Sequence, residues 1–243
     1  MTKINVKGAV VSNDDADIYD WLGYDCVSPN MVEDVLNNSD GDVEVDIASG
    51  GGSVFAASEI YTMLKAYSGK VVVNIQGLAA SAASVIAMAG DEINMSPTSQ
   101  MMIHKASTVS WGNADDFAHD SKMLDVTDQS IVNAYEAKTG MDRSDILQLM
   151  ANETWMTAQD AVDKGFADNI STGSKTPQLV NAIGNQPIFD SNAIAKIKTV
   201  LAKARDAKPE NKVETPKNTE KKPTPSLKDQ KLAILLGDEI NGN

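Results

Sequence analysis

Four short segments contain the residue types that acyl-transfer enzymes use. Ser81 lies within GLAASAAS, residues 77–84, and His104 ends the apolar stretch MMIH. Three consecutive glycines stand in SGGGSV, residues 49–54, and Glu153 directly precedes the sequence TWMTA. A serine hydroxyl becomes a good nucleophile when an imidazole takes its proton, and backbone N–H groups made accessible by glycine can stabilise developing negative charge. The four segments are therefore candidates for a catalytic site.

Each segment taken alone also has a structural interpretation. Ser81 stands where a helix is expected to begin, and serine is a common N-cap. The glycines are equally consistent with a tight turn. A single histidine at the end of a strand is more often structural than catalytic, and an exposed glutamate is unremarkable. Both interpretations stay open for each segment by itself.

Strands and helices are expected to alternate along residues 1–174. Val43, Val45 and Ile47 alternate with acidic residues, which predicts a half-buried strand that stops at the glycines. The same patterns predict further strands at 71–75, 92–95 and 101–103, and helices at 53–67, 81–89, 115–139, 143–150 and 157–165. This order implies crossover connections and an α/β fold with a layered core.

Taken together, the order and spacing of these segments resemble the Clp protease proteolytic-subunit family. This group of serine peptidases includes phage-encoded relatives that process capsid precursors. Residues 49–52 resemble the family's S-P-G-G turn, with Gly50 in place of proline, and residues 77–81 match its G-x-A-A-S motif. Residues 97–104 match its P-x-S-x-x-M-I-H segment, and residues 161–168, AVDKGFAD, resemble its A-V-x-x-G-L-x-D sequence.

The resemblance implies a catalytic triad. Ser81 would be the nucleophile, His104 the general base, and Glu153 the acid that orients the imidazole, where the best-known family members have aspartate. Histidine suits the role of base because its unperturbed pKa lies near 6.5. We therefore expect activity to rise as the pH increases through roughly 6 to 7.5.

The resemblance also implies residues that surround the triad. Gly52 and Ala82 would supply the N–H groups of the oxyanion hole, and Gly51 and Ser53 would contact the substrate. Such donors stabilise charge that appears only in the tetrahedral intermediate. The resemblance implies no cofactor and no metal ion.

The family's fold implies a spiral of strand-strand-helix units, related to that of crotonases, with a protruding helical handle at residues 115–150. It also implies a homo-oligomeric ring acting on protein or peptide substrates. Gly50, the short stretch before the first strand and the charged C-terminal segment are more similar to the phage head-maturation branch. We therefore expect an ATP-independent endopeptidase that processes capsid or scaffold precursors, and the short N-terminus argues against an unfoldase ATPase as partner.

The chain is expected to divide into three regions. Residues 1–174 would form the ClpP-like peptidase domain, and residues 175–207 an extension with a short amphipathic helix, marked by apolar Ile194 and Ile197. Residues 208–243 are rich in charge and proline, so they are expected to form a flexible tail.

Composition excludes several other classes of protein. The formal net charge of -13 argues against nucleic acid or an anionic membrane as the main partner. A single cysteine, Cys26, rules out an intramolecular disulfide framework. No long apolar run or secretory signal is visible, so we expect a location in the cytoplasm, or in an assembling phage head within the host.

Two other functions are kept as alternatives. The first is a crotonase-like acyl-CoA enzyme, which shares the spiral core and a two-amide oxyanion hole; such enzymes generally place carboxylates where this chain has Ser81 and His104. The second is a non-catalytic assembly protein that has kept the fold and uses its tail to recruit a partner.

Overall fold

The computed structural model describes residues 1–171 and 191–206. The predicted tail at 208–243 and the first part of the predicted extension, residues 175–190, lie outside the described residues. The described chain forms two compact units. The described part of the larger unit comprises residues 1–16 and 25–171, and it contains all the candidate site residues.

The larger unit is built on one twisted, largely parallel sheet. Its strands run in the order β2 (Cys26–Val27), β1 (Thr2–Val10), β3 (Val43–Gly52), β4 (Val71–Ala80), β5 (Glu92–Met95) and β8 (Asn169–Ile170). Two more strands, β6 (Gln100–Ile103) and β7 (Thr154–Thr157), branch off: β6 pairs in parallel with the end of β4, and β7 pairs antiparallel with β6. The expected α/β fold is confirmed.

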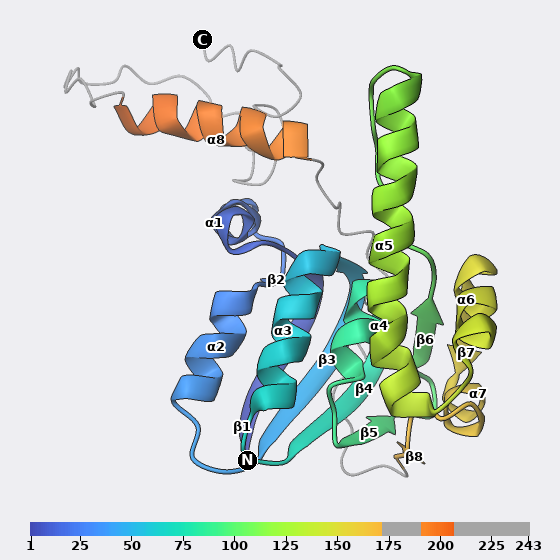
Figure 1. Ribbon diagram of the computed structural model, residues 1–243. Coiled ribbons are helices and arrows are strands. Elements are labelled where there is room, and N and C mark those ends of the chain that lie inside the picture. Colours follow the sequence, from blue (N-terminus) through green and yellow to red (C-terminus); the bar gives the residue numbers. More distant parts are fainter. Residues whose placement is uncertain (172–190, 207–243) are drawn as a thin grey trace, which may run out of the picture. The chain divides into compact units, whose positions relative to one another are not determined.

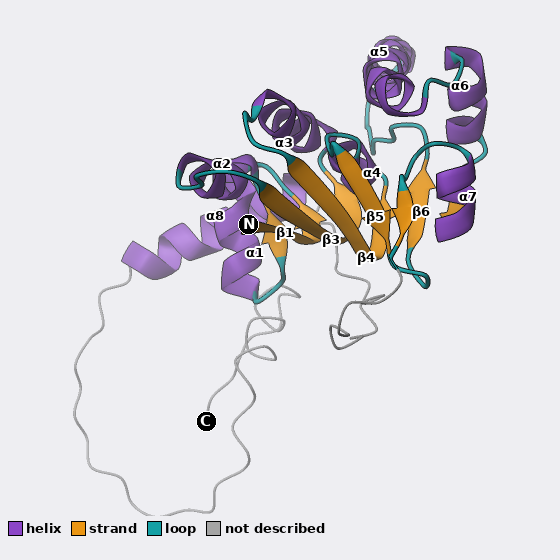
Figure 2. Cartoon of the chain, turned by 90° about the horizontal axis from the view of Figure 1, so that it is seen from below, coloured by secondary structure: helices purple, strands orange, loops and turns teal. Residues whose placement is uncertain are grey.

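Helices cover one face of this sheet. Figure 2 shows α2 (Pro29–Asn37), α3 (Val54–Ala66) and α4 (Ala82–Ala87) on the same side of the strands. The alternating residues Val43, Val45 and Ile47 of β3 are completely buried, as are Ile60 of α3 and Ile86 of α4. Burial of these aliphatic side chains stabilises the packing of the helices on the sheet. β3 and β4 lie in the middle of the strand order, and each leads into a helix at its carboxyl end.

The sequence pattern predicts that the strand ends at the glycines. In the structure the strand continues through them. β3 extends to Gly52, and Gly51 and Gly52 pair with Ala9 and Val10 of β1 after a register shift between Lys7 and Ala9. Their φ angles of 96° and 149° lie in a region that favours glycine. A Cβ on Gly52 would stand 2.1 Å from the Val10 carbonyl oxygen. Only glycine lets the two strands remain this close.

The predicted handle is present as a long helix followed by a short one. α5 (Ala114–Thr139) begins with a capping box at Asn113, and α6 (Arg143–Ala151) folds back along it. One end of α5 packs on the sheet unit and the other projects beyond it (Figure 1). α7 (Ala158–Asp163) follows β7, so the helix predicted at 157–165 is shorter than expected and is preceded by a strand.

The described part of the smaller unit comprises residues 17–24 and 191–206. Its described parts are the second half of α1 (Asn13–Leu22) and α8 (Ser191–Asp206), which lies where the apolar spacing predicts an amphipathic helix. Ile194 and Ile197 are buried, whereas Val200 is exposed. Among the described residues, no helix is both long and apolar enough to cross a membrane.

Candidate active site

Ser81 occupies the sharp turn between β4 and α4. Its φ of 55° and ψ of -126° are unusual for a residue with a side chain. Its N–H donates to the Met102 carbonyl at 2.9 Å, and the preceding residue Ala80 pairs with Met102 in the sheet. The turn is therefore held against β6, the strand that leads to His104.

The structure brings Ser81 and His104 together. His104 follows the last residue of β6, and its Nε2 lies 2.7 Å from Ser81 Oγ. When Nε2 carries no proton, it can accept the hydroxyl proton as the oxygen attacks a carbonyl carbon. Both side chains line one small cavity, together with Val54, Ala82, Val85, Ala106, Ile131 and Tyr135. An apolar pocket thus lies directly beside the hydroxyl.

The two predicted oxyanion donors lie at the ends of β3 and β4. Ala82 is the first residue of α4, so its N–H has no partner within the helix. Gly52 is the last residue of β3. The N–H of the following residue, Ser53, donates to the Val10 carbonyl of β1 at 2.7 Å.

Gly51 lies against the nucleophile turn. A Cβ built on it would stand 2.8 Å from Ser81 Cβ and 2.9 Å from Ala82 N, so glycine is needed for this approach. The Gly51 N–H donates to Ser49 Oγ at 3.1 Å, and the Ser53 hydroxyl caps α3 by accepting from Ala56 N. The N–H groups of Gly51 and Ser53 thus both have protein partners, and the Ser53 carbonyl accepts from Ala57 N at 3.0 Å.

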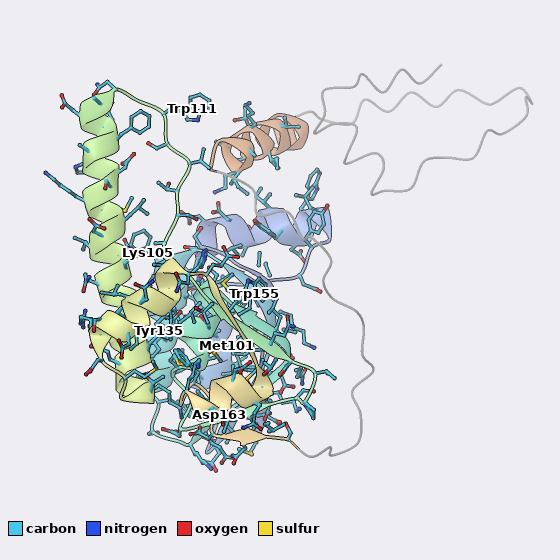
Figure 3. All side chains as sticks on the ribbon, turned by 90° about the vertical axis from the view of Figure 1, so that its right-hand side faces the viewer. Met101, Lys105, Trp111, Tyr135, Trp155 and Asp163 are labelled. Carbon is cyan, nitrogen blue, oxygen red and sulfur yellow. The ribbon has the colours of Figure 1, made fainter. Side chains whose placement is uncertain are left out.

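Glu153 lies opposite His104 but forms no hydrogen bond with it. In the antiparallel pair, Ile103 faces Thr154, so the next position along each strand matches His104 with Glu153. Glu153 has a φ of 47°, and its carboxylate accepts a hydrogen bond from the half-exposed Trp155 indole at 3.3 Å. Trp155 of β7 is labelled in Figure 3. Among the described residues no hydrogen bond joins Glu153 to His104.

Three polar residues behind the pair were not anticipated. Ser84 is fully buried, and its Oγ lies 2.6 Å from the Ser81 carbonyl oxygen and 2.8 Å from the Tyr135 hydroxyl. Burial raises the pKa of Tyr135, so the phenol keeps its proton. Asp128, also buried, accepts from Ala106 N at 2.7 Å. The only sequence signal for Asp128 and Tyr135 is spacing: with Ile131, they recur at helical intervals along α5.

Comparison with known proteins gives one family match. Residues 25–174 match the model of the family described as Clp protease. The "ATP-dependent Clp protease proteolytic subunit 1" of Chlamydia abortus is 34% identical over 128 residues, which are 51% of this chain and 67% of that protein. The "ATP-dependent Clp protease proteolytic subunit" of Bacteroides fragilis is 30% identical over 131 residues, or 53% and 63% of the two chains. The matches thus span about two thirds of each relative's length.

A solved structure shows a similar fold. A mutant of ClpP1 from Listeria monocytogenes superposes with a TM-score of 0.58 at 20% identity, covering 70% of this chain and 91% of that one. The parallel sheet with its helices is therefore of the ClpP type.

Proposed function

Because the chain belongs to the Clp protease family, we propose that it is a serine endopeptidase with Ser81 as nucleophile and His104 as general base. The observation that supports this assignment is the 2.7 Å contact between Ser81 Oγ and His104 Nε2. Two residues that lie 23 positions apart in the sequence meet at the distance that proton transfer requires.

The proposed reaction has two stages. His104 takes the hydroxyl proton as Ser81 Oγ attacks the peptide carbonyl carbon, and the N–H groups of Gly52 and Ala82 stabilise the oxyanion. His104 then gives the proton to the leaving amine, and the C–N bond breaks to leave an acyl-enzyme. Water, activated by the same imidazole, hydrolyses that ester and restores the Ser81 hydroxyl.

We propose Glu153 as the acid that orients the imidazole. Its position opposite His104 supports this role, and a change of its rotamer would release the carboxylate from Trp155. If so, Glu153→Gln lowers kcat by about 100-fold or more. Trp155→Phe is the matched control, because it removes the competing donor and should leave kcat unchanged or higher. Equal kcat for Glu153→Gln and the wild type would remove Glu153 from the mechanism.

The proposed substrates are proteins or peptides, which would lie beside Gly51 and Ser53, and the proposed assembly is a homo-oligomeric ring. Gly50 and the charged, proline-rich segment at 208–243 support capsid or scaffold precursors of a phage as the physiological substrates. ATP independence stays a prediction; cleavage of such a precursor in the absence of any ATPase would test it.

Labelling with a fluorophosphonate tests the peptidase proposal. The wild type should form one covalent adduct, which peptide mapping places on Ser81, while Ser81→Ala should form none and should not cleave a peptide library. An unlabelled wild-type protein that binds coenzyme A would favour the crotonase-like alternative. A wild type that is neither labelled nor able to hydrolyse any peptide would favour the non-catalytic assembly protein.

A further inference from the structure

Helix α5 carries two buried polar side chains, Tyr135 and Asp128, that contact residues close in sequence to Ser81 and His104. Tyr135 is 1% exposed and Asp128 is 4% exposed. Burial of such polar groups costs free energy unless they form hydrogen bonds. The residues to which Tyr135 and Asp128 are hydrogen-bonded are therefore the ones that these side chains position. The partners of both lie next to the two reacting residues.

Tyr135 is connected to the nucleophile through one side chain. The Ser84 hydroxyl has a single proton and donates it to the Ser81 carbonyl at 2.6 Å. The Ser84 oxygen is therefore the acceptor in its 2.8 Å contact with the Tyr135 hydroxyl. The result is a directed relay from Tyr135 to Ser84 to the Ser81 carbonyl.

The relay ends on a strained residue. Ser81 has a positive φ, a conformation that persists only where surrounding contacts hold it. Its N–H is bound by Met102, and its carbonyl accepts from both the N–H and the hydroxyl of Ser84. Loss of the relay would leave the Ser81 carbonyl with fewer donors and the turn freer to relax, which would move Oγ relative to His104.

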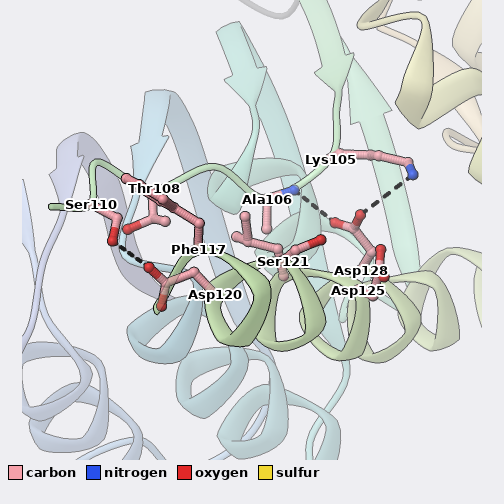
Figure 4. Close-up of a pocket in the computed structure, with 10 residues that line it drawn as sticks. Lys105, Ala106, Thr108, Ser110, Phe117, Asp120, Ser121, Asp125 and Asp128 are labelled. Carbon is pink, nitrogen blue, oxygen red and sulfur yellow. Dashed lines mark hydrogen bonds and ion pairs between the residues drawn. The ribbon is translucent and has the colours of Figure 1, made fainter. Parts of the chain in front are cut away.

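Asp128 holds the segment that follows the base. Its Oδ1 accepts from Ala106 N at 2.7 Å, and its Oδ2 lies 3.8 Å from Lys105 Nζ (Figure 4). Ala106 is two residues beyond His104, where β6 has already ended. Without this contact the chain after His104 would lose its anchor on the side of α5.

The two contacts lie on one face of the helix. Asp128 and Tyr135 are seven residues apart, or about two turns, so their side chains project in the same direction. Ile131 lies between them and lines the cavity beside Ser81 and His104. Figure 4 shows Asp128 projecting from α5 toward the segment at Lys105 and Ala106.

We propose that α5 sets the distance between Ser81 and His104, with Tyr135 and Ser84 positioning the nucleophile and Asp128 positioning the segment of the base. These are positioning residues that act through Ser81 and His104. This inference rests on the proposed serine-peptidase function. It adds that Tyr135, Ser84 and Asp128, three side chains outside the proposed triad, hold Ser81 and the segment after His104 in place.

The relay is tested with Tyr135→Phe, Ser84→Ala and the double variant. Tyr135→Phe keeps the ring, and Ser84→Ala removes one atom, so both keep the shape of the core. Each should lower kcat and the rate of fluorophosphonate labelling by about 10-fold to 100-fold, with KM within about twofold of wild type. Because the two act through one relay, the double variant should be no slower than Ser84→Ala alone. Tyr67→Phe, which removes a hydroxyl bonded to the carbonyls of Ser39 and Gly41, is the control.

The anchor is tested with Asp128→Ala and Asp128→Asn. The alanine variant should lose kcat to a similar extent, whereas asparagine keeps an oxygen acceptor for Ala106 N and should retain more activity. Asp125→Asn removes an exposed carboxylate from the same helix and should behave as wild type. If Asp128→Ala does not fold, the relay variants decide the proposal.

Thermal unfolding separates positioning from stability. The proposal is overturned if the relay variants unfold at lower temperature but keep wild-type kcat and labelling rates, or if the losses of the single variants multiply in the double variant. A wild type that fails to label at Ser81 would instead overturn the serine-peptidase function itself. Wild-type labelling combined with slow labelling of the variants supports both.

Discussion

Replacement of Gly51 by alanine should disrupt the site, whereas the same change at the neighbouring Gly50 should not. A Cβ on Gly51 would lie 2.7 Å from the Ala80 carbonyl oxygen, 2.8 Å from Ser81 Cβ and 2.9 Å from Ala82 N. Each distance is shorter than a normal van der Waals contact, and two of the three atoms belong to the backbone. A Cβ on Gly50 would meet no atom within 4 Å.

Two costs contribute to the expected loss of stability. The φ of 96° at Gly51 is unfavourable for any residue with a Cβ, at about 1–3 kcal/mol. Overpacking against the Ser81 turn adds about 1–3 kcal/mol. Together they predict that Gly51→Ala lowers the free energy of unfolding by about 2–6 kcal/mol. Displacement of Ser81 by a large fraction of an ångström should slow covalent labelling by about 100-fold.

Urea unfolding and the rate of fluorophosphonate labelling measure the two effects. Gly50→Ala is the matched control and should change the free energy of unfolding by less than about 0.5 kcal/mol. The reasoning fails if Gly51→Ala labels at the wild-type rate with unchanged stability. It fails equally if Gly50→Ala is as damaged as Gly51→Ala, because the cost would then not come from close contacts with the Ser81 turn.

Three further predictions concern hydrogen-bonded polar side chains. Ser49→Ala should lower the free energy of unfolding by about 1–3 kcal/mol in urea titrations, because the buried Ser49 hydroxyl donates to Gly8 O and accepts from Gly51 N; an unchanged midpoint would contradict this. Burial raises the pKa of Tyr135, so the folded state keeps a proton that the unfolded state releases above about pH 10. Above that pH the free energy of unfolding should therefore fall more steeply for the wild type than for Tyr135→Phe. Hydrogen bonds from the Thr157 hydroxyl and N–H lower the pKa of Asp160. The Asp160 carboxylate therefore stabilises the fold above the ordinary carboxyl pKa, and this contribution is lost as the pH falls below about 4. The difference in melting temperature between wild type and Asp160→Asn should disappear as the pH falls through this range.

Much of the fold could be predicted from local patterns. Alternating Val43, Val45 and Ile47 predicted β3, and β5 has the predicted bounds, because side-chain periodicity follows directly from strand geometry. Strand ends were less accurate. β3 and β4 extend through their glycines because pairing with neighbouring strands outweighs local propensity, and β7 was missed because its pairing partner β6 lies about 50 residues earlier in the chain.

The amino-acid sequence by itself determined the residue types and the order of the candidate site: a serine after a strand, a histidine at the end of another, and an acid before TWMTA. The tertiary structure decided which of them meet. It placed Ser81 Oγ against His104 Nε2, left Glu153 bonded to Trp155, and brought Tyr135 to Ser84 across 51 residues. Sequence patterns report periodicity within one element, whereas these contacts depend on the packing of α5 and β7 against strands formed elsewhere in the chain.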